Sequence, residues 1–98
     1  MVRFLPKLDA NGKAPAGRRF LLPLRMQDET GAIVRPRQLT VEVSYDDGSS
    51  WRRVPVSPGL VARLDHPAGA SSVSLRVSAT DRDGNTVRQT VTRAYLLR

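Results

Sequence analysis

The sequence contains no cysteine, a single histidine, and only one Trp, two Tyr and two Phe among its 98 residues. Without cysteine the chain forms neither a disulfide framework nor a thiolate metal site. A domain without cysteine is compatible with both oxidising and reducing compartments. A general base at His66 would need a positioned partner, and Asp65 is expected to point to the opposite face of a strand. We therefore predict no catalytic, cofactor-binding or metal-binding residue, and a turn role for His66 before Pro67.

Long apolar runs are also absent, and the N-terminus has neither the apolar core nor the cleavage site of a signal peptide. Hydrophobic residues make up 40% and charged residues 26%, enough for one folded domain. The net charge is +7, but arginines are spread singly, with pairs only at Arg18-Arg19 and Arg52-Arg53. We predict neither membrane nor nucleic-acid binding. Steep salt dependence would reveal the nucleic-acid alternative.

The stretch from Leu39 to Trp51, LTVEVSYDDGSSW, is the clearest local signal in the chain. Its apolar residues up to Tyr45 alternate with polar ones, the period-two pattern of a half-buried strand. Asp47-Gly48 follows, a strong hairpin signal because Gly adopts positive φ without steric cost and Asp tolerates it. The return strand is expected to open at Trp51.

Similar alternation recurs along the chain and predicts about seven short strands. The segments are 2–5, 20–26, 39–45, 51–56, 60–64, 73–79 and 87–96, with a brief extended piece at 32–34, turn chemistry over 7–17 and a bulge near Arg52-Arg53. The fold class is all-β, a two-sheet antiparallel β-sandwich of immunoglobulin-like or fibronectin type III-like type. The missing Cys-Trp-Cys pattern favours the fibronectin-like version. Trp51, Tyr45 and Phe20 are predicted to fill the core.

Ser44, Asp46, Gly48 and Trp51 match the Asp-box pattern Ser-x-Asp-x-Gly-x-x-Trp of sialidase-like propellers. The spacing has a local physical reason, since the carboxylate accepts turn N–H groups, Gly supplies positive φ and the aromatic ring anchors the hairpin. Propellers repeat such boxes in every blade, whereas this chain has one. We predict a structural hairpin and no sialidase activity.

Four acidic residues lie in two turns, Asp46 and Asp47 in one, Asp81 and Asp83 in the other. Oxygen-rich turns can hold Ca²⁺, but Thr92 occupies the position where a calcium loop starting at Asp81 would carry its bidentate Glu. We predict Asx turns in hairpins.

Arg76 and Arg88 are predicted to point outward from the last two long strands as diagonal neighbours among Ser and Thr. This surface is either a solvated face or a contact surface for an acidic partner. The solvated face is the preferred interpretation.

The order of several short motifs resembles the C-terminal domain of large secreted subtilisin-like serine peptidases of actinobacteria. The likeness covers nearly the whole chain, and its pieces are APAGRRF from Ala14, VEVSYDDG with Trp51, DHPAG from Asp65, VSLR from Val73, ATD from Ala79, GNT from Gly84, and Ala94-Tyr95.

The resemblance implies a non-catalytic accessory β-sandwich, residues 1–98, excised from a longer exported multidomain chain. It also implies an extracellular location. The partners would be neighbouring domains of the parent chain, protein substrate or a cell-wall polymer. The subtilisin nucleophile lies in Gly-Thr-Ser and its base in His-Gly-Thr, and the chain has neither motif. Ser44 and His66 therefore receive no catalytic role.

A carbohydrate-binding module of an extracellular enzyme is the alternative. Such modules usually expose several aromatic rings that stack on sugars, whereas most aromatic residues here are expected in the core. Tyr95 is the one residue predicted to offer an exposed platform.

Overall fold

The computed structural model describes Met1 to Arg98 and contains nine β-strands and no helix. The strands are β1 (Val2–Phe4), β2 (Lys13–Ala14), β3 (Arg19–Gln27), β4 (Ile33–Val34), β5 (Gln38–Ser44), β6 (Arg52–Val54), β7 (Val61–Asp65), β8 (Ser72–Thr80) and β9 (Thr86–Leu97). No segment forms a helix long and apolar enough to span a bilayer. The all-β class predicted from the alternating pattern is confirmed.

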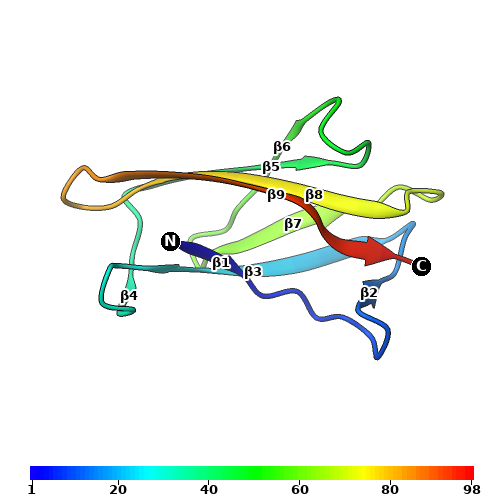
Figure 1. Cartoon of the computed structure of the whole chain (residues 1–98), viewed down its shortest axis with the longest axis horizontal. Helices are drawn as coiled ribbons and strands as arrows, with labels where there is room; N and C mark the ends of the chain where they lie inside the picture. Colours follow the sequence, from blue (N-terminus) through cyan, green and yellow to red (C-terminus); the bar gives the residue numbers. More distant parts are fainter.

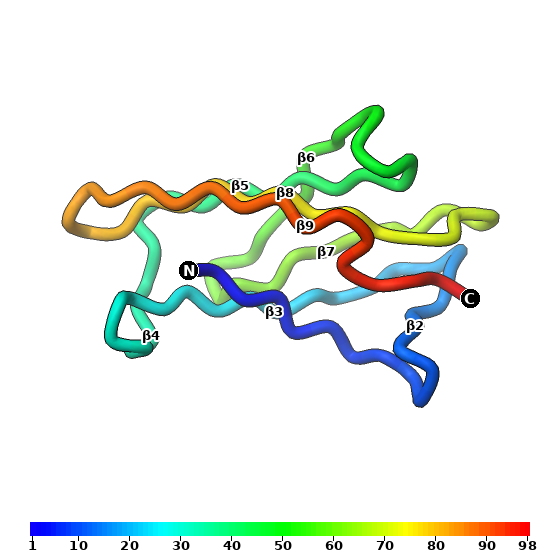
Figure 2. Tube along the Cα trace, viewed as in Figure 1, coloured from blue at the N-terminus to red at the C-terminus, as the bar shows by residue number.

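The strands form two sheets that lie as separate layers (Figure 1). In the four-stranded sheet, β3 pairs with β1, β4 and β7, while the five-stranded sheet has the order β2-β9-β8-β5-β6. All pairs are antiparallel except β2 with β9. The trace in Figure 2 shows how the chain passes between the layers, so that strands far apart in sequence become neighbours.

The hydrophobic core lies between the two sheets. Along β3, buried and exposed residues alternate from Phe20 to Met26, and β5 and β8 supply the facing layer. Leu22 of β3 and Val41 and Val77 of the other sheet have no exposed surface. A half-apolar strand hides its apolar side only against a second layer, so the alternation and the two-layer arrangement have one cause.

The number of strands is nine and not about seven, because two pairings involve only two residues each. One of them, β4, falls on the brief extended piece at 32–34. The other, β2, lies where only turn chemistry was predicted. Ala14 there is fully buried and its carbonyl accepts the N–H of Arg98, so tertiary pairing with β9 overrides the local turn signals.

The predicted bulge near Arg52-Arg53 is also wrong. β6 pairs regularly with β5, Arg53 opposite Glu42, and Trp51 simply precedes the strand. The irregularity lies in β9 instead, where Val73 pairs with Tyr95 but Leu75 pairs with Val91. Two extra residues therefore stand in β9 between these pairs, which bends the strand and shifts its side chains.

One side chain joins the free edge of β1 to the other sheet. Gln89 of β9 accepts the N–H of Val2 at 2.6 Å and donates to the Val2 carbonyl at 3.0 Å. Both Val2 groups point away from β3, to the side on which β1 has no neighbouring strand. The amide of Gln89 thus satisfies backbone groups that would otherwise lie unpaired at a sheet edge.

Three tight turns share one five-residue construction with the sequence Asp-x-x-Gly-x. They begin at Asp9, Asp28 and Asp81, and in each the carboxylate accepts the N–H groups two and four residues further on. Backbone N–H donors at Asp9 and Asp81, and the Thr30 hydroxyl at Asp28, hold the pKa of these carboxyls below the usual range. The glycines take φ of 74°, 87° and 87°.

A fourth turn repeats this construction with different residues. Ser57 accepts the N–H of Val61 through its hydroxyl oxygen, and Leu60 stands at the glycine position with φ of 61°. A non-glycine residue in the left-handed region is strained. Leu60 packs against the core, and its carbonyl accepts the N–H of Leu24. Packing thus retains a leucine where the turn favours glycine.

We expect Leu60→Gly to be more stable than Leu60→Ala by about 1 kcal/mol. Both variants lose the packing of the leucine, but only glycine removes the strain at positive φ. Urea unfolding of both proteins measures the difference. Gly84→Ala is the control, because it introduces the same strain where an added Cβ would meet nothing within 4 Å. A Leu60→Ala protein more stable than Leu60→Gly would contradict the strain argument.

Candidate functional site

The hairpin turn after β5 is organised by two polar side chains. Ser44, which is buried, donates its hydroxyl hydrogen to Asp46 at 2.6 Å and accepts the N–H of Gly48 at 2.8 Å. Asp46 also accepts the N–H and the hydroxyl of Ser50 at 2.9 and 2.6 Å. The two hydroxyl groups, followed by the backbone N–H, lower the pKa of Asp46 to about 2. The carboxylate is thus charged and accepts three hydrogen bonds within the turn.

Two of the three aromatic residues predicted for the core lie at its margin or outside it. Phe20 is buried in the core and Tyr45 packs against it, but Trp51 is not part of it. The Trp51 ring lies beside Gly48, where an added Cβ would be 3.5 Å from the ring, and the Arg76 guanidinium lies 4.3 Å from the ring centroid. Trp51 therefore packs against the turn outside the core.

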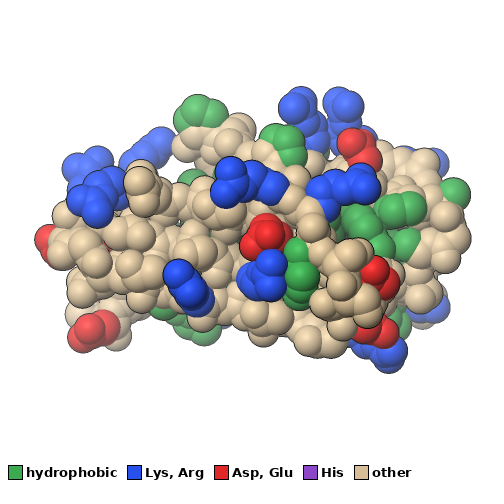
Figure 3. All heavy atoms as spheres, turned by 90° about the horizontal axis from the view of Figure 1, so that it is seen from above, with side chains coloured by type: hydrophobic (Ala, Val, Ile, Leu, Met, Phe, Trp, Pro, Cys, Tyr) green, Lys and Arg blue, Asp and Glu red, His purple; other side chains and the backbone are tan.

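Arg76 and Arg88 lie on the outer face of the five-stranded sheet. Arg76 is opposite Thr90 and Arg88 is opposite Ser78, so the two arginines are diagonal neighbours. Arg76 pairs with Glu42 at 3.1 Å, whereas Arg88 is exposed and has no salt bridge. Figure 3 looks onto this layer and shows basic side chains spread among polar groups, with few acidic ones. A contact surface for an acidic partner here stays a prediction.

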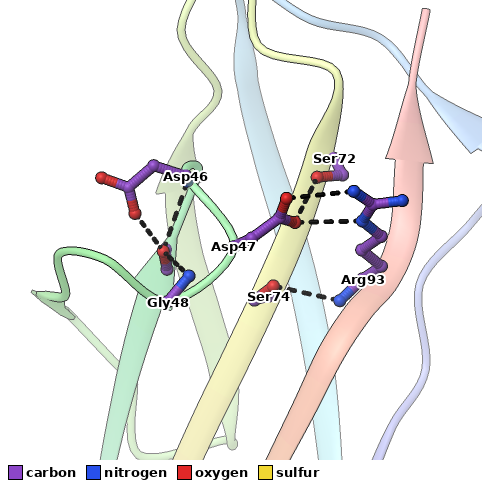
Figure 4. A network of polar contacts seen from close by, with 7 residues as sticks. Asp46, Asp47, Gly48, Ser72, Ser74 and Arg93 are labelled. Atoms are coloured by element: carbon purple, nitrogen blue, oxygen red, sulfur yellow. Dashed lines mark hydrogen bonds and ion pairs between the residues drawn. The ribbon is translucent and has the colours of Figure 1, made fainter.

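A bidentate ion pair ties the hairpin turn to the bulge of β9 (Figure 4). The Arg93 guanidinium donates through Nε and Nη2 to the two carboxylate oxygens of Asp47, each at 3.0 Å. The Ser74 hydroxyl oxygen accepts the Arg93 N–H at 3.0 Å, and Ser72 lies 3.5 Å from Asp47. The ion pair raises the pKa of Arg93 and lowers that of Asp47.

Both members of this ion pair have positive φ, 57° for Asp47 and 53° for Arg93. The side-chain contacts therefore hold two strained backbone positions, one in the turn and one in the bulge. Sequence reasoning did not find this pair. The residues are 46 apart in the chain, and their meeting depends on the bulge, which local patterns did not reveal.

His66 is buried and does not stand in an exposed turn. Its ring stacks on Phe20 with centroids 4.9 Å apart, Nδ1 lies 3.1 Å from the Pro15 carbonyl, and Nε2 lies 3.0 Å from the Tyr95 hydroxyl. A carbonyl only accepts, so the neutral ring carries its hydrogen on Nδ1 and accepts the Tyr95 hydroxyl at Nε2. The prediction of a simple turn residue is wrong, because Pro15 and Tyr95 come from distant segments.

Burial lowers the pKa of His66, which keeps the ring neutral at pH 7. Burial also raises the pKa of Tyr95, whose side chain is only 3% exposed. Tyr95 cannot offer a platform to a sugar, so that expectation is wrong. Tyr95 pairs with the buried Val73, so its ring points into the core.

The Asp81 turn lies beside a hollow of about 690 Å³. Asp81, Asp83, Asp28 and Glu29 are among its lining residues, with Met26 at the apolar side. The Asp81 carboxylate accepts two backbone N–H groups and the Asn85 side chain within the Asx turn. No group of three or more His, Cys, Asp or Glu side chains is arranged to hold a metal ion.

Comparison with known proteins finds no family model that matches the chain. No curated protein matches it either. The resemblance to the C-terminal domains of subtilisin-like peptidases therefore stays a prediction.

We expect Asp47 and Arg93 to show a clear coupling in a double-mutant cycle. Asp47→Ala and Arg93→Ala each remove both hydrogen bonds of the bidentate pair, so the double variant should lose less stability than the sum of the single ones. Urea unfolding of the four proteins gives the coupling.

Arg19 and Asp65 provide the matched control. They form a single exposed contact at 3.6 Å, a geometry that usually contributes little. A coupling at Asp47–Arg93 no larger than that at Arg19–Asp65 would show that the pair does not hold the turn to the bulge.

We expect the stability of the protein to fall between pH 7 and pH 5 because of His66. Its folded pKa lies below the unfolded value of about 6.5, so the unfolded state binds more protons as the pH falls through that value. His66 is the one histidine, and the carboxyl groups titrate at lower pH.

Urea midpoints at several pH values test this prediction. His66→Asn retains a side-chain donor for the Pro15 carbonyl but cannot titrate, so its midpoint should be lower at pH 7 and should not change down to pH 5. An equal pH slope in both proteins would remove His66 as the cause.

Proposed function

We propose that the chain is a non-catalytic, immunoglobulin-like or fibronectin type III-like accessory module of a secreted subtilisin-like serine peptidase. In this role the module packs on the protease domain and stabilises it, or presents a surface to protein substrate or to a cell-wall polymer. The proposed location is extracellular.

The order of the seven longer strands supports the fold type in this proposal. The first, second and fifth of them, β1, β3 and β7, share one sheet, and the third, sixth and seventh, β5, β8 and β9, share the other. This is the distribution in immunoglobulin-like sandwiches. The fourth, β6, pairs with β5 and not with the first sheet. That pairing favours the fibronectin type III-like arrangement over the constant-type immunoglobulin one.

One observation carries the non-catalytic part of the proposal, namely that the groups most suited to nucleophile and base roles are committed to structural bonds. Ser44 serves its own turn, and Ser74 accepts the N–H of Arg93. His66 contacts a tyrosine hydroxyl and a backbone carbonyl, not a serine and a carboxylate. A nucleophile must be within hydrogen-bond reach of its base, and these residues are not joined by any such bond.

Incubation of the purified chain with casein and with ester substrates tests the proposal. We expect no turnover above that of a buffer blank. His66→Asn and Ser44→Ala serve as controls, because true activity of the chain should respond to the loss of its one histidine or of the buried Ser44, whereas a contaminating protease should not. Turnover that these variants abolish would overturn the accessory role.

The genomic reading frame tests the proposed context. We expect it to encode, in frame upstream of this module, a protease domain with Asp, His and Ser motifs of the subtilisin kind. A reading frame with no such domain would contradict the peptidase assignment.

A further inference from the structure

The outer face of the four-stranded sheet combines an apolar row with arginines that have no salt bridge. Pro23 of β3 pairs with Val61 of β7, and the Leu5 N–H, on the other side of β3, bonds to the Pro23 carbonyl. Leu21 lies one row further along β3, opposite Arg63. Leu21 is 57% exposed and Leu5 41% exposed. We call this surface, Leu5, Leu21, Pro23 and Val61 with their neighbouring arginines, the β3 face.

The charges on the β3 face are almost entirely positive. Arg3 and Arg25 are directly opposite each other in the β1–β3 pair, an arrangement of like charges that destabilises a sheet. Neither has a salt bridge, and Arg63 has none. The acidic residue paired along β3, Asp65, lies opposite Arg19 and forms an exposed 3.6 Å contact with it. The fold therefore leaves three guanidinium groups without a counter-charge around the apolar row.

A hollow adjoins this surface. It measures about 380 Å³ and is lined by Leu21, Val61 and Arg63 from the two strands and by Pro55, Val56 and Ser57 from the segment that covers the edge of β7. Its lining thus combines apolar side chains with the basic residue Arg63. An apolar side chain whose neighbours are carboxylates would match both features.

We propose that the β3 face is the docking surface for an acidic protein segment that presents apolar side chains between carboxylates. The inference deepens the accessory role proposed above and rests on it, since it names the surface through which the module would contact a protease domain or a protein substrate. A second copy of the chain is the wrong occupant, because two such faces would bring the same arginines together in a chain of net charge +7. Charge complementarity selects an acidic partner, and the apolar row selects a protein over a purely anionic polymer.

Titration of the ¹⁵N-labelled chain with a synthetic peptide tests the inference. The probe is a seven-residue peptide in which three leucines alternate with four glutamates. Two matched peptides replace either its leucines by serine or its glutamates by glutamine. We expect amide shifts at Leu21, Val61 and Arg63, and weaker binding by about tenfold or more for each matched peptide. Substitution of exposed side chains leaves the fold stable enough to compare variants.

Three variants locate the site. Leu21→Ser and Arg63→Glu should each raise the dissociation constant about tenfold, while Arg88→Glu, with the same charge change on the opposite sheet, should alter it less than about twofold. An equal effect of Arg88→Glu, equal binding of the serine peptide, or no shift on the β3 face at millimolar probe would each overturn the inference. None of these experiments measures turnover, so failure of the docking surface is distinguishable from failure of the accessory role.

Discussion

The pairing of β8 on both of its edges is the constraint on which the rest of the structure depends. β8 pairs with β5 from Ser74 to Thr80 and with β9 on its other side, and its inner residues Val73, Leu75 and Val77 have no exposed surface. A central strand with one face fully buried cannot slip by one residue without reversing every side chain. That fixed register places Arg76 outward beside Glu42, and Ser72 and Ser74 where the turn and the bulge meet.

The bulge in β9 relaxes the same constraint at one end of the sheet and allows the polar network to form. Tyr95 lies just beyond the bulge, opposite the buried Val73, so its ring enters the core and reaches His66. Arg93 at the bulge turns toward Asp47. The buried aromatic cluster and the exposed ion pair therefore lie on either side of one irregularity in β9. The histidine and serine side chains that could have suggested catalysis, His66 and Ser74, form structural hydrogen bonds here, to the Tyr95 hydroxyl and to the Arg93 N–H.

Period-two alternation was sufficient to predict the all-β class, the two layers and most of the longer strands, because burial of one strand face is a local property that the sequence records. Features made by distant contacts could not be predicted. β2 depends on pairing with the last residues of β9, and His66 is buried by Pro15, 51 residues away. Trp51 was expected inside on account of its size, yet Gly48 and Arg76 provide a place for it outside.

The contact between Gln89 and Val2 protects the exposed edge of β1 against pairing with another chain at high local concentration. An exposed strand edge with free N–H and C=O groups is a template on which a neighbouring chain can add a strand, the first step toward aggregated sheets. At β1 a side-chain amide already occupies both groups of Val2. A glutamine from the other sheet thus blocks the addition of a further strand at Val2.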